Sequence, residues 1–206
     1  MYLSRIVLDS DLREVKRAVS SPQVLHAAVE ACFETKGRNL WRLDFLHNAF
    51  NLLLVSETTP NFSGFEKQFC ASGVHGETKE YLPLISNIKQ GQKLRFRLKG
   101  NTVRSLVTEK GKRGKVVPHV TDSHKRDWLR SKSESNGFLL EENSFDLIET
   151  GRQRFWRESK QVDLTYGVFE GLLEITDTEL FMNALTRGIG RAKGYGYGLM
   201  TVMGVR

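Results

Sequence analysis

A lone histidine is the residue in this chain best suited to acid–base chemistry. Apolar residues recur at helical spacing over residues 24–33, and His26 falls at the border of the resulting apolar face. An imidazole there is half desolvated but reachable, so it could act as a general acid or base near neutral pH. Helix histidines more often pack or face solvent, and the sequence alone leaves both interpretations open. None of the histidines has metal-ligand spacing with a nearby carboxylate or thiolate, so we expect no metal and no cofactor.

A glycine-rich segment offers a second kind of chemistry. Residues 188–198 contain five glycines, Gly190 among them, together with Arg191 and Lys193. Glycine permits positive φ angles and brings backbone N–H groups close to a ligand, which suits a phosphate cradle. The segment is not a dinucleotide fingerprint, because that motif follows a strand and opens a helix. The alternative is a tight connection packed on a sheet.

A basic, aromatic segment at residues 151–160 suits contact with RNA. Phe155 and Trp156 are interleaved there with positive charge. Its basic residues are Arg152, Arg154, Arg157 and Lys160. Such a mixture could contact phosphates and base edges or stack on an RNA end. An exposed hairpin with an aromatic ring packed beneath it is the alternative.

The distribution of charge along the chain also favours contact with nucleic acid. The net charge is +7, and between Arg104 and Lys132 nine basic residues stand against three acidic ones. Further candidates for RNA contact are Lys112, Arg113 and Lys115 in an expected basic turn, and Arg95 and Arg97 on an alternating strand. A concentrated positive field favours nucleic acid or an acidic membrane surface. It could equally be a solvated face.

The expected elements follow a recognisable order. In the first half we expect strands at residues 2–8, 40–45, 50–55 and 93–99, with helices after Ser21-Pro22 and at residues 63–70. In the second half we expect strands at 103–107, 116–120, 145–148, 162–175 and 199–205. Helices there are capped by Asp122 or Ser123 and by Thr176 with Glu179. This order predicts an α+β protein of two tandem ferredoxin-like domains with antiparallel sheets, at residues 1–100 and 101–206.

The composition of the chain excludes several classes of protein. With 206 residues and 39% hydrophobic content, the chain is neither disordered nor fibrous. Two cysteines do not make a disulfide framework, and no signal peptide or membrane span is expected, so a reducing cytoplasm is the expected location. No G-x-S-x-G or paired-carboxylate pattern suggests acyl transfer or glycoside hydrolysis.

Six motifs, in order, resemble the CasE family, the CRISPR repeat-cleaving endoribonuclease subunit of the type I-E Cascade complex. They are MYLSRI at residues 1–6, LHA at 25–27, LRFRLKGN at 94–101, KVVP at 115–118, FEGLL at 169–173 and GIGRAKGYGYGL at 188–199. Each is short, but their order and the glycine pattern of the tail make the match specific over nearly the full length.

This resemblance implies tandem ferredoxin-like (RRM-like) domains and metal-independent cleavage of the repeat hairpin in precursor CRISPR RNA. It implies that His26 is the catalytic histidine and that other Cascade subunits are partners. On this basis Lys160 and Arg157 are candidates for the cation that stabilises the phosphorane. Family members often carry a tyrosine three residues before the histidine, where this chain has Gln23, which can bind RNA but cannot titrate. Whether Tyr166, Tyr195 or Tyr197 replaces that phenol stays open.

Two other functions stay open from the sequence. One is a non-catalytic subunit that binds the RNA hairpin while another nuclease cuts, which Gln23 favours. The other is a basic domain that binds a small acidic ligand at the glycine loop. That last function leaves the basic segment at residues 151–160 unexplained.

Overall fold

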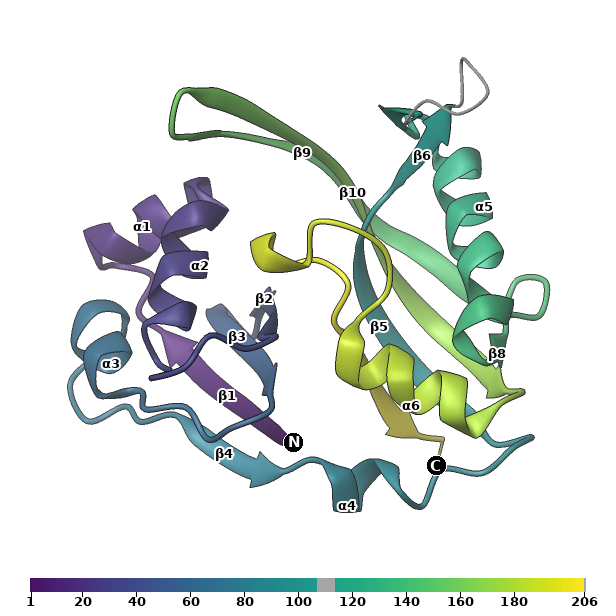
Figure 1. Ribbon diagram of the computed structural model, residues 1–206, viewed down its shortest axis with the longest axis horizontal. Coiled ribbons are helices and arrows are strands. Elements are labelled where there is room, and N and C mark those ends of the chain that lie inside the picture. Colours follow the sequence, from purple (N-terminus) through teal and green to yellow (C-terminus); the bar gives the residue numbers. More distant parts are fainter. Residues whose placement is uncertain (107–113, 206) are drawn as a thin grey trace.

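The computed structural model describes residues 1–106 and 114–205, which form two α+β units, each with an antiparallel sheet (Figure 1). Lys112 and Arg113 lie outside the described residues. The two-unit α+β organisation expected from the sequence is confirmed. None of the helices in these ranges is both long and apolar enough to cross a membrane.

The first unit is a four-stranded sheet covered by helices. Its strands are β1 (Tyr2–Leu8), β2 (Leu40–Leu46), β3 (Ala49–Ser56) and β4 (Glu77–Glu80), in the order β2-β3-β1-β4. Its helices are α1 (Arg13–Ser20), α2 (Pro22–Glu30) and α3 (Ser63–Phe69). The β2–β3 turn is formed by His47 and Asn48, both with positive φ, as a tight hairpin requires. The core packs Ile6 and Leu52 of the sheet against Leu25 of α2.

Helix α2 carries His26, so its local origin matters. Pro22 occupies the first turn, where its missing N–H costs no hydrogen bond. Leu25 and Val29, one turn apart, are buried against the sheet. Ser21 is extended before the helix, but its side chain makes no capping hydrogen bond.

The second unit contains the larger sheet. Its strands are β5 (Lys93–Asn101), β8 (Phe138–Leu139), β9 (Phe145–Arg157), β10 (Lys160–Ile175) and β11 (Met200–Gly204). The order is β11-β5-β10-β8, with β9 also paired to β10. The helices are α5 (Asp122–Ser133) and α6 (Thr178–Arg187), with short turns η1 (Glu134–Asn136) and η2 (Lys193–Tyr195). Helix α4 (Leu82–Ile85) connects the units, and β6 (Val103–Leu106) pairs with β7 (Lys115–Pro118) in a separate ribbon.

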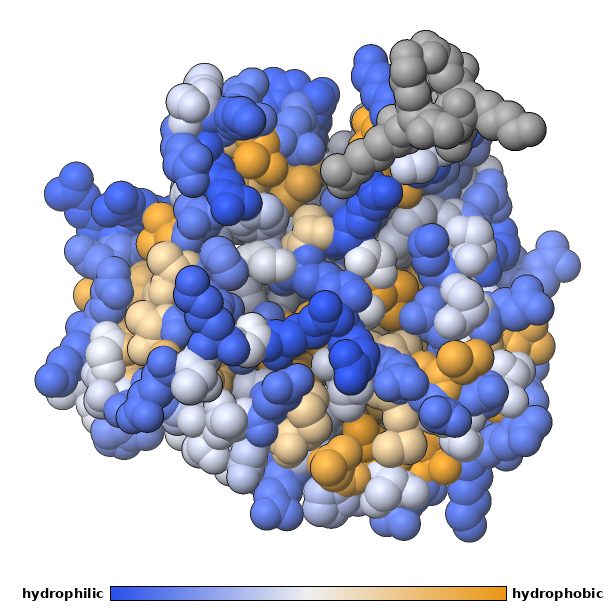
Figure 2. All heavy atoms as spheres, in the orientation of Figure 1, coloured by the Kyte–Doolittle hydropathy of each residue, from blue (hydrophilic) through white to orange (hydrophobic). Residues whose placement is uncertain are grey.

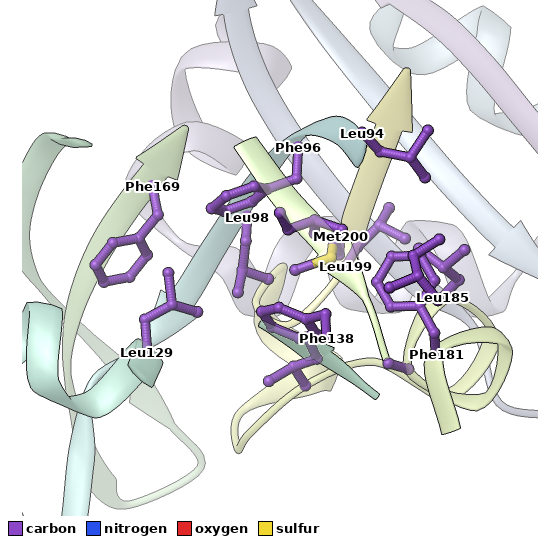
Figure 3. Close-up of a cluster of buried hydrophobic side chains, with 14 of the residues drawn as sticks. Leu94, Phe96, Leu98, Leu129, Phe138, Phe169, Phe181, Leu185, Leu199 and Met200 are labelled. Atoms are coloured by element: carbon purple, nitrogen blue, oxygen red, sulfur yellow. The ribbon is translucent and has the colours of Figure 1, made fainter. Parts of the chain in front are cut away.

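The core of the second unit lies between its sheet and helices α5 and α6. Leu94, Phe96 and Leu98 project from one face of β5 toward this layer. Figure 3 shows them among Leu129, Phe181 and other buried side chains.

One strand belongs to a different unit than expected. Residues 93–99 were expected to complete the first sheet, but β5 pairs with β10 and β11 in the centre of the second, and β4 takes the edge of the first. An alternating pattern fixes which face of a strand is buried but not which sheet it joins. We therefore propose that the division lies between β4 and β5, earlier than residue 100.

Two expected helix caps were also wrong by one or two residues. Thr121, one residue before Asp122 and two before Ser123, accepts from the backbone N–H of His124 to cap α5. Asp177 accepts from Leu180 N–H at 2.9 Å to cap α6, in place of Thr176. Both caps are the extended residue immediately before the first helical turn, as capping requires.

A buried arginine joins the two sheets. The Arg42 side chain on β2 is 1% exposed and pairs with Asp44 at 2.9 Å. Its Nη1 donates to the carbonyl oxygens of Arg97 and Leu199, and its Nη2 donates to Thr201 Oγ1. These bonds run from the first sheet to β5 and to the chain around β11, so they fix how the units sit against each other.

Candidate functional site

His26 lies near the middle of α2, on the side that faces the second unit. Its side chain is 34% exposed, as its border position on the helix predicts. Its Nδ1 atom is buried without a hydrogen-bond partner among the described residues, and the Glu30 carboxylate is 4.0 Å away. The nitrogen left to meet a substrate is therefore Nε2.

The glycine-rich segment brings a tyrosine to this histidine. The rings of His26 and Tyr195 meet edge to face with centroids 6.1 Å apart. A Cβ atom on Gly194 would stand 3.5 Å from His26 Cε1, so the backbone before Tyr195 runs beside the imidazole. Figure 1 shows this loop between α2 and the second sheet.

The long β9–β10 hairpin supplies the third part of the site. It extends beyond the sheet toward α1 and α2 (Figure 1). Phe155 of β9 is buried and packs against Tyr195, with the centroids of the two rings 4.9 Å apart. Arg157 Nη1 donates a hydrogen bond to the Tyr195 hydroxyl at 3.3 Å. His26, Tyr195 and Arg157 thus come from three distant segments and form one cluster, which we call the histidine site.

The loop that carries Tyr195 also carries a lysine. Burial, and then the nearby charge of Arg38, lowers the pKa of Lys193 in η2. Lys193 is two residues from Tyr195 in the chain. An anion bound to Lys193 would offset both the burial of its charge and its repulsion by Arg38. The surroundings of Lys193 are therefore favourable for a phosphate.

Among the three tyrosines left open by the sequence, only Tyr195 contacts His26. Tyr166 donates to Glu149 at 2.8 Å, and Tyr197 is buried and donates to Gln153 at 2.8 Å. Gln23 contributes no phenol, and its Oε1 atom is buried without a partner in the described ranges.

Lys160 stands at the end of the hairpin, opposite Arg157 in the strand register. It is exposed, and within residues 1–106 and 114–205 it makes no hydrogen bond or ion pair. The structure thus brings Arg157 to the histidine site and leaves Lys160 beside it, on the solvent side.

The other hairpin arginines are held by one acid. Arg152 donates to Asp163 at 2.6 Å and Arg154 donates to it at 3.1 Å, which lowers the pKa of that carboxyl. Trp156 is 64% exposed. The hairpin with an aromatic ring packed beneath it is therefore confirmed for Phe155, whereas RNA contact through this segment stays a prediction.

The remaining candidates are dispersed. Arg97 pairs with Asp44 and Glu170 inside the joint between the sheets, whereas Arg95 is exposed on the same strand face. Lys115 is exposed at the start of β7. Arg191 donates to Ser105 Oγ at 3.2 Å.

Gly190 has a structural reason for being glycine. It has a φ of +82°, and a Cβ there would lie 3.0 Å from the Trp128 ring. It thus serves close packing, and only the η2 part of the loop reaches the histidine site.

Two features of the site could not be located from the sequence. Tyr195 was one of three possible phenols, because nothing in the spacing links residue 195 to residue 26. Lys99, half-buried over the Tyr166 ring at 4.5 Å, was not singled out, because an alternating strand gives no sign that one of its lysines is enclosed. Within the described ranges no group of three His, Cys, Asp or Glu residues could hold a metal ion.

Comparison with known proteins adds to this geometry. A family model described as CRISPR associated protein matches residues 1–203. The CRISPR-associated endoribonuclease Cse3 of Thermus thermophilus is 29% identical over 219 residues, covering 98% of this chain and 99% of that protein.

Two solved structures share the fold throughout. Cse3 endoribonuclease bound to a 19-nucleotide RNA superposes with a TM-score of 0.84 and 27% identity, covering 98% of this chain and 100% of the other. Thermus thermophilus Cse3 bound to an RNA representing a pre-cleavage complex gives a TM-score of 0.82 at 27% identity, with 98% of each chain covered. With a family model that spans almost every residue, the chain belongs to the CRISPR associated protein family.

Proposed function

We propose that this protein is an endoribonuclease that cleaves the repeat hairpin of precursor CRISPR RNA and keeps the product within Cascade. The observation that carries this proposal is the histidine site, where a half-exposed imidazole meets a tyrosine and an arginine from the other unit. Similarity to Cse3, whose structures contain bound RNA, supports it.

The chemistry needs only groups that the chain supplies. The ribose 2′-oxygen next to the scissile phosphate attacks phosphorus, and the bond from phosphorus to the 5′-oxygen breaks. The products are a 2′,3′-cyclic phosphate and a 5′-hydroxyl, so one proton leaves the nucleophile and one reaches the leaving oxygen. His26 Nε2 is placed to carry one of these transfers.

The cations around His26 suit the charge of the transition state. Arg157 is held by Tyr195, and Lys193 belongs to the same loop as Tyr195. A phosphorane carries more negative charge than the phosphate diester, and preorganised cations stabilise the additional charge. Lys160 is close enough to Arg157 along the hairpin to join them on the RNA-bound enzyme.

The hairpin surface suits an RNA stem. Arg152, Arg154 and Trp156 are exposed on the face of β9 opposite Phe155 and Arg157, and the face drawn in Figure 2 is largely hydrophilic. Phosphate contacts from arginines give affinity for a duplex without reading its sequence. We infer that the stem lies along this hairpin, with its base at His26.

The compartment follows from the thiols. Cys32 and Cys70 are both free and buried, and burial raises the pKa of each to about 11. Unpaired structural thiols suit a reducing compartment. We propose that the protein acts in the cytoplasm, together with other Cascade subunits.

The test is cleavage of a labelled repeat hairpin in EDTA. Native protein is expected to cut, and both His26→Ala and a 2′-deoxy substitution at the cut site are expected to abolish cutting while binding persists. His75→Ala, at a histidine that is 76% exposed on another part of the first unit, is the matched control. Tight binding without cutting by native protein would instead establish a non-catalytic hairpin-binding subunit.

A further inference from the structure

A cavity of about 320 Å³ lies between the two units, next to the histidine site. Helices α1 and α2 form one wall, β2 and β3 form another, and the start of the β9–β10 hairpin closes it from the second unit. Tyr195 lines this cavity and also contacts His26, so the two spaces share one side chain. The proposed chemistry does not use this cavity.

The β2–β3 wall offers an aromatic surface. Phe45 lines the cavity and is 55% exposed, and its ring lies 4.9 Å from that of Phe50. A phenylalanine exposed to this degree contributes little to the core of its own unit. An exposed aromatic ring held by contact with a neighbouring ring is well suited to stacking against a base.

The opposite wall offers a cation. Lys99 Nζ stands 4.5 Å from the centroid of the Tyr166 ring and 5.6 Å from that of Tyr197. Among the residues that the structure describes, no carboxylate lies within ion-pair distance of it. Burial lowers the pKa of Lys99, and the charges of Glu149 and Asp44 offset this effect only in part. A phosphate would supply that missing charge.

A hydrogen-bond acceptor lies between these two walls. Glu149 lines the cavity and uses Oε1 to accept from the Tyr166 hydroxyl. Its second carboxylate oxygen has no partner within residues 1–106 and 114–205. Amino and imino groups on base edges donate to such an oxygen.

We propose that this cavity binds one unpaired nucleotide of the RNA, adjacent to the hairpin stem, with its base on Phe45 and its phosphate toward Lys99. An RNA duplex is too wide for a space of this volume, whereas a single base with its sugar is not. This inference rests on the proposed function. It adds that the enzyme reads the strand that flanks the stem as well as the stem itself.

The experiment measures binding of repeat hairpins that carry one abasic site at each unpaired position on either side of the stem. Native protein, Phe45→Ala and Lys99→Met are compared. Leu84→Ala, at an exposed apolar residue on α4, is the matched control. We expect one abasic position to weaken binding to native and control protein about tenfold, the scale of one lost base stack. Phe45→Ala should bind the intact and abasic hairpins equally.

Three results would overturn the inference. They are equal binding of every abasic hairpin by native protein, an undiminished abasic penalty in Phe45→Ala, and saturable binding of free AMP or UMP with no sensitive position in the RNA. Phe45 is exposed, so its variant folds even if Lys99→Met does not. Because the readout is binding, failure of this inference is distinguished from failure of the proposed function, which would show as absence of cleavage by native protein.

Discussion

Replacing Arg42 by methionine tests whether one buried ion pair holds the two units in register. Arg42 and Asp44 have side chains 1% and 3% exposed, and the guanidinium also bonds to two carbonyl oxygens and a hydroxyl of the second unit. Methionine retains the apolar stem and removes every one of these donors. Among the residues that the structure describes, Arg97 is then the one ionic partner left to Asp44.

The expected loss of unfolding free energy is about 3–5 kcal/mol, the usual cost of removing one member of a buried pair. This is a large part of the about 5–15 kcal/mol by which most proteins are stable. The double variant Arg42→Met with Asp44→Leu should recover part of that loss, although the two carbonyl oxygens and the Thr201 hydroxyl still lack the Arg42 donor. It leaves no unpaired buried charge, because Arg97 keeps Glu170.

Urea unfolding followed by circular dichroism measures both variants. The midpoint should fall in the single variant and return toward the native value in the double variant. RNA cleavage should remain slow in both, because His26 and Tyr195 approach each other across the joint that Arg42 holds. A single variant within about 1 kcal/mol of native, the range of an exposed pair, would refute this reasoning.

Three further outcomes follow from local geometry. Tyr195→Phe should slow single-turnover cleavage about tenfold at unchanged stability, because it removes the hydroxyl that holds the hairpin arginine; an unchanged rate would exclude that role. Gly196→Ala should lower stability by about 2 kcal/mol or more in chemical denaturation, because φ is +85° and its Cβ would stand 2.5 Å from the Trp41 ring, whereas Gly64→Ala meets no atom within 4 Å. The pKa of Glu66 is lowered by a backbone amide and a neighbouring histidine, so its contribution to stability is complete above the ordinary value of about 4.3 and is lost as pH falls through the folded value. Glu66→Gln should therefore lower stability at pH 7 more than at pH 3, and an equal loss at both would contradict this.

Much of the fold was predictable because its signals are local. The alternation over residues 93–99 and the Ser21-Pro22 start predicted β5 and α2 correctly as elements. Helix α1 was missed because only Val15 and Ala18 of its eight residues are buried, too few to make a periodic pattern. The prediction that β5 belongs to the first sheet was wrong, because tertiary packing decides which strands pair.

The candidate site was predictable only in part, for a related reason. His26 could be singled out from its position on one helix. Its neighbours Tyr195 and Arg157 come from a loop and a hairpin tip, and their approach depends on how two units dock. No spacing within a segment encodes that docking.

Because residues from both units form the histidine site, the site cannot be complete until its residues in both units have been synthesised. His26 emerges from the ribosome long before Tyr195. Domains generally fold as they are made, from the N-terminus onward, so the first unit can form around His26 while its partner residues are still untranslated. A growing chain therefore cannot process RNA until Tyr195 has been made, and a message truncated before η2 yields a fragment that leaves precursor RNA intact.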